Sequence, residues 1–265
     1  MSGTAAAEPR LSIVTVVLDD PGGLEATARS VAEQGFRDYE YLVIDGGSGP
    51  ATQAVLARIR ETLTTLVSEP DGGLYHAMNK GLGLARGTWI QFLNAGDTYL
   101  APGSLAAFMD AARPGTEVLY GDHVACYPGW RRPMRAADPE FLPYGGFACH
   151  QALLVRTELA RRIGGFREAY WPAADYDFVC RLMALGPSHQ HLPQDLIAYQ
   201  CGGLSEIHAV RSRLREWRIS REHFGPSPGR DLSFLLRLGP SLANTALRRL
   251  GLAGVTNALR RLRHG

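Results

Sequence analysis

The sequence of 265 residues has very little lysine: lysine and arginine together number 28, and Lys80 is the only lysine. Long hydrophobic runs are also missing, because no stretch approaches the roughly 18 apolar residues of a membrane-spanning helix. Residues 1–10 are small or polar and contain no apolar segment, so the sequence predicts no signal peptide. Four widely spaced cysteines form no C-x-x-C pair, and we therefore expect reduced, buried thiols in a cytoplasmic protein.

Several well-known nucleotide-binding and catalytic patterns are absent too. The first predicted strand–helix turn, residues 19–23, reads DDPGG and not G-x-G-x-x-G, which argues against a dinucleotide fold of the dehydrogenase type. A Walker A sequence is missing, so phosphates are not held by a P-loop. The same turn lacks the glycine-rich, basic signature of a sugar nucleotidyltransferase, which remains the alternative enzyme. No serine and aspartate in recognisable triad spacing accompany His150, so nucleophilic catalysis is not expected.

The charge of the chain is distributed unevenly. The net charge of +2 and the pI of about 8.4 are too mild to indicate a nucleic-acid partner. Residues 225–265 carry seven arginines and one aspartate, a net charge of +6, which leaves about −4 for the rest. The GPSPG break at 225–229 predicts a boundary there. We therefore expect a disordered lead at 1–10, a globular domain at 11–224 and a basic amphipathic extension at 225–265.

The order of predicted elements indicates an α/β fold. Apolar, β-branched runs alternate with helical patterns, which is typical of βαβ units and a mainly parallel sheet. Strands are expected at 11–18, 39–44, 63–67, 88–93, 118–120, 147–155 and 191–199, and helices at 24–34, 52–62, 74–85, 103–112, 157–163, 175–185 and 207–224. Residues 121–146 are predicted to form a loop or hairpin over the site.

Acidic residues follow three of the first four strands. Ligands of an open parallel sheet bind beyond the carboxyl ends of its strands, where Asp19, Asp45 and Asp97 are expected. Asp45 could accept from a ribose hydroxyl or a base N–H, or it could cap the next helix. Asp97 suits a hard divalent cation that bridges a diphosphate, although a turn aspartate is the alternative.

The predicted helix at 74–85 has two faces. Leu74, Met78, Leu82 and Ala85 fall on one apolar stripe, and His76, Asn79, Lys80 and Gly83 lie roughly opposite. A solvated polar face is the simple interpretation. Because the helix begins after a strand end and an Asp-Gly-Gly turn, we predict that this face binds a diphosphate, with Lys80 as a point charge.

Two aspartates begin the predicted helix at 175–185. Asp175 and Asp177 lie about 200° apart on a helix, so they cannot share one site. Asp175, held ionised by the helix dipole, could act as a general base. A charge that merely favours the helix N-terminus is the alternative for both and the preferred one for Asp177. His208 could approach the diphosphate or a metal.

Together these segments resemble the family 2 glycosyltransferases of the GT-A fold, over about residues 11–224. YLVIDGGS resembles the family's second strand, and DGGLYHAMNKGLGLARGTWIQFLNAGD is similar to a bacterial branch that reads DxGxYDAMNKGxxxAxGxxxxFLNSGD. FACHQALLVR and IGGFREAY are similar to acceptor-side segments, and PAADYDFVCRL resembles the EDxDLxxR base motif. The chain departs from the family pattern at Asp19, Gly46, Asn94, Gly96 and Ala174, where asparagine or acids are usual.

The resemblance implies one Rossmann-like αβα nucleotide-binding domain with a helical C-terminal tail. It implies inverting, metal-dependent transfer from a UDP-, dTDP- or GDP-sugar to a hydroxyl of a glycan, lipid-linked or natural-product acceptor. With the residue patterns above, it predicts Asp175 as the general base and Mg²⁺ or Mn²⁺ bound by Asp97 and His208. It predicts acceptor contacts from His150, Gln151 and Asp177. The predicted donor contacts are Val16, Asp19, Asp45, Gly72, Asn79, Lys80, Asn94 and Ala95. The thinned motifs leave a degenerate nucleotide-sugar-binding protein as the non-catalytic alternative.

The extension at 225–265 contains leucine-rich stretches broken or flanked by arginines. This pattern is typical of an interfacial helix on an anionic membrane, which would bring the protein near a lipid-linked acceptor. A helix packed on the body, or disorder, is the alternative. We therefore expect a cytoplasmic protein with a possible peripheral contact at the inner face of the membrane.

Overall fold

The computed structural model describes residues 8–203, 207–249 and 261. Most of the predicted lead, and the end of the predicted extension, therefore lie outside the described residues. The described residues form a nine-stranded mixed sheet in the order β3-β2-β1-β4-β8-β6-β9-β5, with β7 paired to β6. The strands are β1 Leu11–Val17, β2 Tyr39–Asp45, β3 Thr65–Ser68, β4 Trp89–Phe92, β5 Thr98–Tyr99, β6 Val118–Tyr127, β7 Trp130–Met134, β8 Leu153–Arg156 and β9 His189–Gln200.

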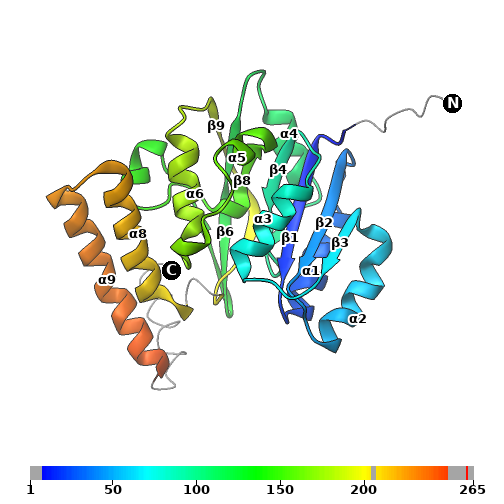
Figure 1. The fold of residues 1–265 in the computed structure, drawn as a ribbon, viewed down its shortest axis with the longest axis horizontal. Coiled ribbons are helices and arrows are strands. Elements are labelled where there is room, and N and C mark those ends of the chain that lie inside the picture. Colours follow the sequence, from blue (N-terminus) through cyan, green and yellow to red (C-terminus); the bar gives the residue numbers. More distant parts are fainter. Residues whose placement is uncertain (1–7, 204–206, 250–260, 262–265) are drawn as a thin grey trace.

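The first four strands run parallel to one another. β1 is buried along its whole length and pairs with β2 on one side and with β4 on the other, which explains why its sequence is apolar almost throughout. Leu11 and Ile13 pack towards one face of the sheet and Val14 and Val16 towards the other. Because the strands are parallel, their carboxyl ends share one edge of the sheet, at the bottom of Figure 1.

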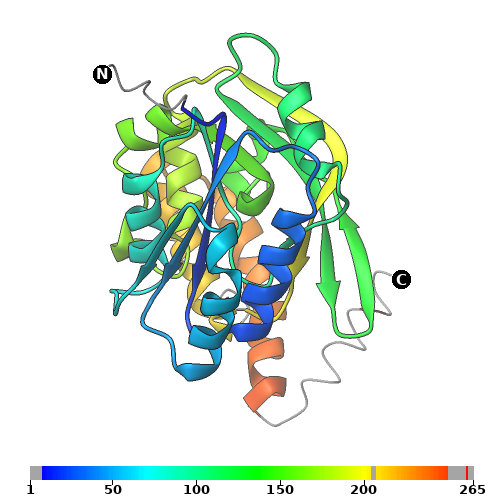
Figure 2. The same ribbon diagram turned by 90° about the vertical axis from the view of Figure 1, so that its right-hand side faces the viewer.

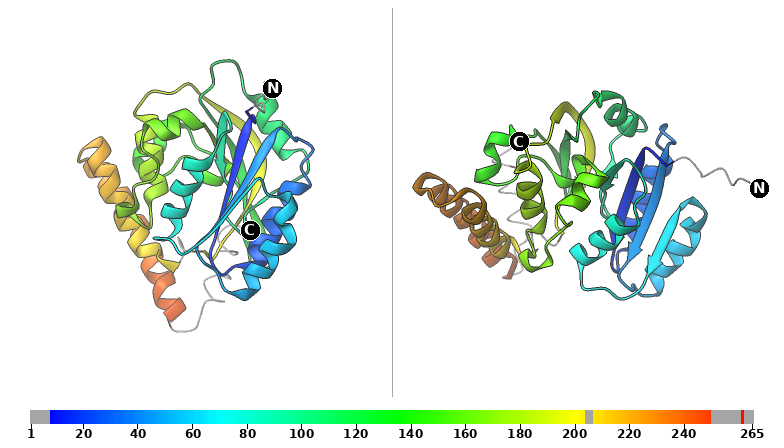
Figure 3. Two further views of the ribbon diagram at one scale, coloured as in Figure 1. Left: turned by 45° about the vertical axis from the view of Figure 1, so that its right-hand side comes forward. Right: turned by 45° about the horizontal axis from the view of Figure 1, so that its top comes forward.

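Helices cover both faces of the sheet (Figures 1 and 3). The helices are α1 Pro21–Ala32, α2 Pro50–Ile59, α3 Leu74–Leu84, α4 Ser104–Ala111, α5 Thr157–Arg162, α6 Ala174–Met183, α8 Ala209–Phe224 and α9 Pro228–Arg249. Buried side chains of α1, α2 and α4 share one apolar core, and those of α3, α5 and α6 share the other. The helices α8 and α9 form a hairpin outside α6. This is the αβα architecture with a helical C-terminal tail that the sequence predicts.

The second half of the sheet differs most from the predicted elements. The strand expected at 147–155 is only four residues long, because a 3₁₀ turn, η3 His150–Ala152, precedes β8. The strand expected at 118–120 continues through residue 127 and forms a hairpin with β7, so the hairpin expected within 121–146 is present. Within the described residues no helix is both long and apolar enough to span a bilayer.

Candidate active site

Four loops meet at the edge where β1, β2, β3 and β4 end. They carry Asp19, Asp45, Asp71 and Asp97. Three of these acids are predicted from the sequence, and Asp71, which follows β3 by three residues, is not among the predicted site residues. The sequence does contain a signal for it, since it too is an acid placed just beyond a strand end.

Asp45 is fully buried and organises the loop that follows it. Its Oδ1 accepts from the Ser48 backbone N–H at 3.1 Å, and its Oδ2 accepts from Gln53 Nε2 at 2.8 Å and from Ser68 Oγ at 2.6 Å. These bonds satisfy the buried carboxylate, and the one from Ser48 holds the backbone just ahead of α2. The predicted contact between Asp45 and a nucleotide stays a prediction.

Asp19 joins the first loop to the second. Its backbone N–H donates to Ser48 Oγ at 2.8 Å, and its Oδ1 accepts from the Gly49 N–H at 2.8 Å. The residue has a φ of 51°, a left-handed conformation that aspartate tolerates better than most side chains. Asp19 is exposed at the sheet edge, in the region where the donor was predicted to bind.

Asp71 lies against Gly46, where the resembling family usually has a second acid. A Cβ atom at Gly46 would lie 3.1 Å from Asp71 Oδ2. The other carboxylate oxygen, Oδ1, accepts from the Gly73 N–H at 2.7 Å. Asp71 therefore occupies space beside the second strand end that a side chain at residue 46 would otherwise fill, and it supplies a carboxylate there. Nearby Gly72 is exposed and donates its N–H to His76 Nδ1 at 2.9 Å.

The loop after β4 is tied to β1 and α1. The Ala95 N–H donates to the Val16 carbonyl at 3.2 Å. Buried Thr27 donates to the Asp97 carbonyl at 2.7 Å and accepts from the Gly96 N–H at 3.0 Å. Gly96 has a φ of 95°, a conformation that glycine adopts without a steric penalty. These bonds fix the turn, and with it the direction of the Asp97 side chain.

Asp97 is only 4% exposed, and its carboxylate is bound by two donors. Gln151 Nε2 donates to Oδ2 at 2.9 Å, and the Gln200 N–H donates to Oδ1 at 2.8 Å. Burial raises the pKa of Asp97 to about 6, although the Gln200 bond, the nearby His150 and the Gln151 bond each oppose the shift. No lysine or arginine of the described chain forms an ion pair with it, so burial is not offset by a fixed positive charge.

The oxygen atoms of Asp97 and of nearby Asn94 suit a divalent cation that is ligated by oxygen. A raised pKa marks a buried carboxylate that a cation would stabilise in its charged form. A second oxygen, the buried Oδ1 of Asn94, has no hydrogen-bond partner among the described residues. The described part of the chain contains no cluster of three acidic, histidine or cysteine ligands. A cation here would therefore take most of its ligands from water and from a substrate diphosphate, as Mg²⁺ commonly does.

Asp175 stands in the first turn of α6 and is 32% exposed at its side chain. Tyr75 of α3 donates its hydroxyl to Oδ1 at 3.0 Å, and His150 Nδ1 lies 3.4 Å from Oδ2. Burial alone would raise the pKa of Asp175. The hydrogen bond and charge of His150, with the hydrogen bond of Tyr75, outweigh burial and hold the pKa below its ordinary value. The carboxylate is thus ionised at neutral pH and partly accessible, as a general base requires.

His150 links Asp175 to the loop after β4. Its Nε2 lies 3.3 Å from Asn94 Nδ2, while its Nδ1 faces Asp175. Its Nδ1 can donate to Asp175, and its other ring nitrogen contacts the Asn94 amide, so the ring bridges the two residues. The structure therefore brings together the predicted base, a predicted acceptor-side residue and a predicted donor-side residue. Tyr75 completes this group and was not predicted as a site residue.

Asn79 and Lys80 make contacts other than those predicted. Asn79 Nδ2 donates to the Phe166 carbonyl at 2.8 Å, and Asn79 Oδ1 accepts from the Phe166 N–H at 2.8 Å. This pair of bonds clamps the turn at Phe166, and the predicted contact of Asn79 with a diphosphate stays a prediction. Lys80 Nζ forms an ion pair with Glu69 Oε1 at 2.8 Å, so its charge is already matched.

Two residues predicted on the acceptor side, Gln151 and Asp177, are buried and form hydrogen bonds to other protein side chains. Gln151 is 2% exposed and donates its amide N–H to Asp97, so it positions that carboxylate, and its acceptor-side role stays a prediction. Asp177 is fully buried between Arg181 Nε at 2.8 Å and His223 Nε2 at 3.0 Å. These contacts satisfy the buried carboxylate, and the acceptor-side role of Asp177 stays a prediction.

His208, the second predicted metal ligand, lies just before α8. Its ring packs edge-on against Trp171 with the centroids 4.7 Å apart. Among the described residues it forms neither a hydrogen bond nor an ion pair with Asp97. Its role as a ligand stays a prediction.

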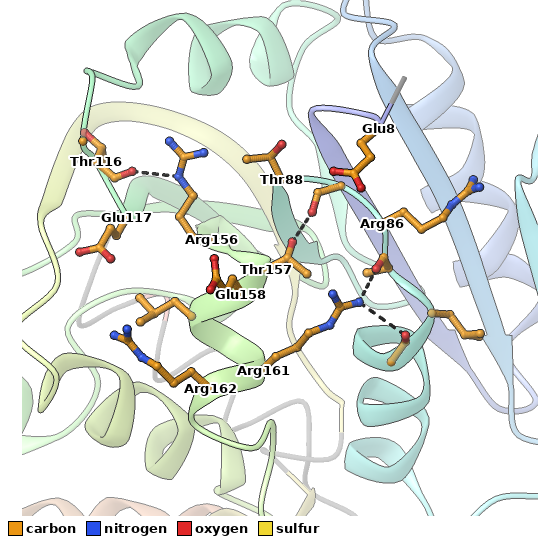
Figure 4. A pocket seen from close by; sticks show the side chains of 16 residues that line it. Glu8, Arg86, Thr88, Thr116, Glu117, Arg156, Thr157, Glu158, Arg161 and Arg162 are labelled. Atoms are coloured by element: carbon orange, nitrogen blue, oxygen red, sulfur yellow. Dashed lines mark hydrogen bonds between the residues drawn. The ribbon is translucent and has the colours of Figure 1, made fainter. Parts of the chain in front are cut away.

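A cavity of about 840 Å³ lies near the opposite edge of the sheet, between the end of α3, the start of β4 and α5 (Figure 4). Its arginines are largely engaged in structural contacts. Arg161 donates to the Leu82 carbonyl at 3.2 Å, and Arg156 donates to the Thr116 carbonyl at 3.1 Å. This cavity is remote from Asp97 and Asp175, so we place the candidate active site at the carboxyl edge of the sheet.

Known proteins resemble this chain over most of its length. The family model for glycosyl transferase family 2 matches residues 12–185. A PGL/p-HBAD biosynthesis glycosyltransferase of Mycobacterium bovis is 33% identical over 224 residues, which cover 81% of this chain and 86% of that protein.

Two solved structures share the fold at low sequence identity. S. aureus TarS in complex with UDP has a TM-score of 0.63 at 18% identity, covering 89% of this chain and 71% of that one. The mannosyltransferase PcManGT from Pyrobaculum calidifontis, in complex with GDP-Man and Mn²⁺, has a TM-score of 0.61 at 18% identity, covering 96% and 81%.

Proposed function

The chain belongs to glycosyltransferase family 2, and on that premise we propose that it is an inverting, metal-dependent enzyme that transfers a sugar from a nucleoside-diphosphate sugar to a hydroxyl group. The donor is of the UDP, dTDP or GDP type, a class supported by the UDP and GDP-Man complexes of two proteins with the same fold. The acceptor is a hydroxyl of a glycan, lipid-linked or natural-product molecule. The family match supports this transferase over the nucleotidyltransferase alternative.

One observation carries the proposal: an ionised, accessible carboxylate lies beside the edge where donors bind. The pKa of Asp175 is held below its ordinary value, and its side chain remains 32% exposed. His150 connects Asp175 to Asn94 on the donor side. A carboxylate that is positioned by two donors and left partly open is prepared to accept a proton from an incoming hydroxyl.

The proposed reaction is a single displacement. The acceptor oxygen attacks the anomeric carbon as its proton passes to Asp175 Oδ1 or Oδ2. A carbon–oxygen bond to the acceptor forms while the carbon–oxygen bond to the β-phosphate breaks, and the nucleoside diphosphate leaves with the bonding electrons. Because attack and departure occur on opposite faces, the anomeric configuration inverts. No protein nucleophile is needed, and the described site has no paired serine or cysteine for one.

Negative charge develops on the departing diphosphate. Asp97 and the free Oδ1 of Asn94 would hold a Mg²⁺ or Mn²⁺ ion, which supplies electrostatic stabilisation of that charge when bound. The loop that carries Asp97 is fixed by Thr27 and Val16, so the carboxylate is already oriented before the substrate arrives. Buried Gln151 holds the carboxylate through a hydrogen bond to Oδ2.

The test is release of nucleoside diphosphate from a panel of UDP-, dTDP- and GDP-sugars with Mn²⁺ and simple hydroxyl acceptors. We expect one donor class to be turned over, and we expect Asp175→Asn to reduce the rate by about 10²–10⁴-fold, the usual contribution of a general base. Asp110→Asn is the matched control, because Asp110 is exposed on α4 and remote from the site.

Equal activity of the Asp175→Asn variant and the wild type would contradict the assignment of the base. Donor binding without turnover, measured as a thermal shift that is unchanged by Asp175→Asn, would favour the non-catalytic alternative.

A further inference from the structure

The helix α9 presents its apolar face to solvent. Among the side chains that the structure describes there, every exposed position carries leucine, alanine, glycine or proline. Leu232, Leu235, Leu236 and Leu242 are each between 50% and 69% exposed. At 100° per residue these four leucines fall within an arc of about 120°, so they form one stripe along the helix.

Two charged side chains that the structure describes on α9 contact the protein. Asp231 accepts from Trp217 Nε1 at 2.7 Å and pairs with Arg221 Nη1 at 3.1 Å, both on α8. Arg237 donates to the Tyr144 carbonyl, and its guanidinium lies 4.5 Å from the centroid of the Phe234 ring. Partial burial of Arg237, with Arg213 close by, lowers its pKa.

An ordinary surface helix buries its apolar stripe and exposes its charges, whereas α9 buries Phe234 and still leaves four leucines exposed on another side. The structure keeps Asp231 and Arg237 against the protein while four leucines of the same helix remain uncovered. An exposed stripe of four leucines indicates that α9 binds an apolar surface.

The charge of this part of the sequence indicates what kind of surface that is. Residues 209–265 contain twelve arginines and three acidic residues, a net charge of +9, which leaves −7 for residues 1–208 of a chain whose net charge is +2. Arg211 and Arg218 are exposed on α8. A second copy would bring two such strongly positive faces together, and the stripe lacks the aromatic side chains in which protein interfaces are enriched. An anionic lipid surface matches both the leucines and the arginines.

We propose that the α8–α9 hairpin docks on a membrane that contains anionic lipid. The leucine stripe of α9 lies at the boundary between headgroups and acyl chains, and the exposed arginines of α8 contact lipid phosphates. In Figures 1 and 2 the carboxyl end of α9 extends past the edge at which β1 and β2 end. Docking therefore holds the candidate active site close to the lipid surface. The inference goes beyond the proposed transfer reaction and does not depend on it.

The test is co-sedimentation of the full chain with phosphatidylcholine vesicles and with vesicles that also contain phosphatidylglycerol. We expect binding to the anionic vesicles alone, and we expect it to weaken in about 1 M salt, where the screening length is about 3 Å. The variant Leu235→Glu/Leu236→Glu should lose more than about tenfold in partitioning, since it replaces two inserted leucines with charges.

Leu84→Glu/Leu100→Glu is the matched control. It makes the same change of charge at two exposed leucines on other parts of the fold, and it should bind within about twofold of the wild type. Circular dichroism and thermal melting of both variants check that each is folded.

Three results would overturn the proposal. The first is equal vesicle binding by the α9 variant and the wild type. The second is a wild-type dimer in light scattering that the α9 variant converts to a monomer, which would make a second copy the occupant. The third is a full chain that ignores vesicles while a chain ending at residue 249 binds them, which would make residues 250–265 the cover of the stripe.

Discussion

The hydroxyl of Tyr75 lies 3.0 Å from Asp175 Oδ1 and 3.1 Å from the Pro172 carbonyl. A tyrosine has one hydroxyl hydrogen, so it can donate to only one of these acceptors at a time. When Asp175 is ionised, the hydrogen stabilises its charge. When Asp175 carries a proton, the carboxyl can donate to the tyrosine oxygen while the tyrosine donates to Pro172. Tyr75 can therefore remain hydrogen-bonded to the base in both of its protonation states.

Tyr75→Phe should shift the pH dependence of the reaction. The hydrogen bond from Tyr75 lowers the pKa of Asp175, so its loss raises that pKa, and the base is then ionised only at higher pH. We expect the acidic limb of kcat/KM to move upward by about one pH unit, while activity well above the limb falls less. Tyr144→Phe, at an exposed tyrosine, should leave the profile unchanged. A lower rate with an unmoved limb would show that Tyr75 acts through packing alone.

His150→Gln should have a larger effect of the same sign. After burial, His150 is the main influence on the pKa of Asp175, and it lowers that pKa through both a hydrogen bond and its charge. We expect kcat/KM at neutral pH to fall at least about tenfold, and the acidic limb to move further upward than in Tyr75→Phe. His189→Gln, at an exposed histidine at the start of β9, is the control. Donor KM should change little, because the contact to Asp175 acts on the acceptor proton.

The first half of the fold and part of the site are readable from local sequence. β-branched runs and the glycine turns after them predict β1, β2 and the edge where Asp45 and Asp97 lie. The second half is less readable, because β6 pairs with β8 and β9 through contacts far apart in sequence. No local pattern reports such pairings.

The contacts within the site show the same limit. Tyr75 and Asp175 are 100 residues apart and meet only because α3 and α6 pack on the same face of the sheet. Asn79 lies on the polar side of α3, where a helical wheel cannot distinguish a ligand contact from a clamp on Phe166. The amphipathic pattern of α9 is visible in the sequence, but which of its faces points outward depends on its packing against α8.

Gly46→Asp should impair the enzyme although the sequence resemblance predicts an acid at this position. The new side chain would meet the Asp71 carboxylate, whose Oδ2 lies 3.1 Å from the site of the added Cβ. The new carboxylate would crowd and repel that of Asp71, so we expect weaker donor binding and a lower melting temperature. The double variant Gly46→Asp/Asp71→Gly should recover much of both losses, as a double-mutant cycle would measure. Additive losses in the cycle would mean that Asp71 does not substitute for the missing acid.

Asn79→Ala should affect stability more than donor binding. The amide makes two bonds of 2.8 Å to the backbone of Phe166, and its removal leaves that turn without them. We expect the free energy of unfolding to fall by about 1–3 kcal/mol while donor KM stays within about twofold of the wild type. Lys80→Met breaks only a partly exposed ion pair with Glu69 and should cost less than about 1 kcal/mol. A large rise in donor KM for either variant would instead support the diphosphate contact predicted from the sequence.

Asp97→Asn should abolish metal-dependent activity and yet stabilise the metal-free protein. The pKa of Asp97 is about 6 in the folded protein and 3.8 in the unfolded chain, so between these values the folded state binds more protons. Stability in this window therefore decreases as the pH rises, and above pH 6 the charged carboxylate costs the native state up to about 3 kcal/mol. A neutral asparagine avoids this cost.

In denaturant titrations without metal, we expect the variant to be the more stable protein at pH 7 and the difference to shrink towards zero near pH 4. Mn²⁺ with a nucleoside diphosphate should stabilise the wild type at pH 7 and have much less effect on the variant, because only a carboxylate gains from the cation. If the two proteins instead differed by the same amount at pH 4 and pH 7, titration of Asp97 would not be the cause.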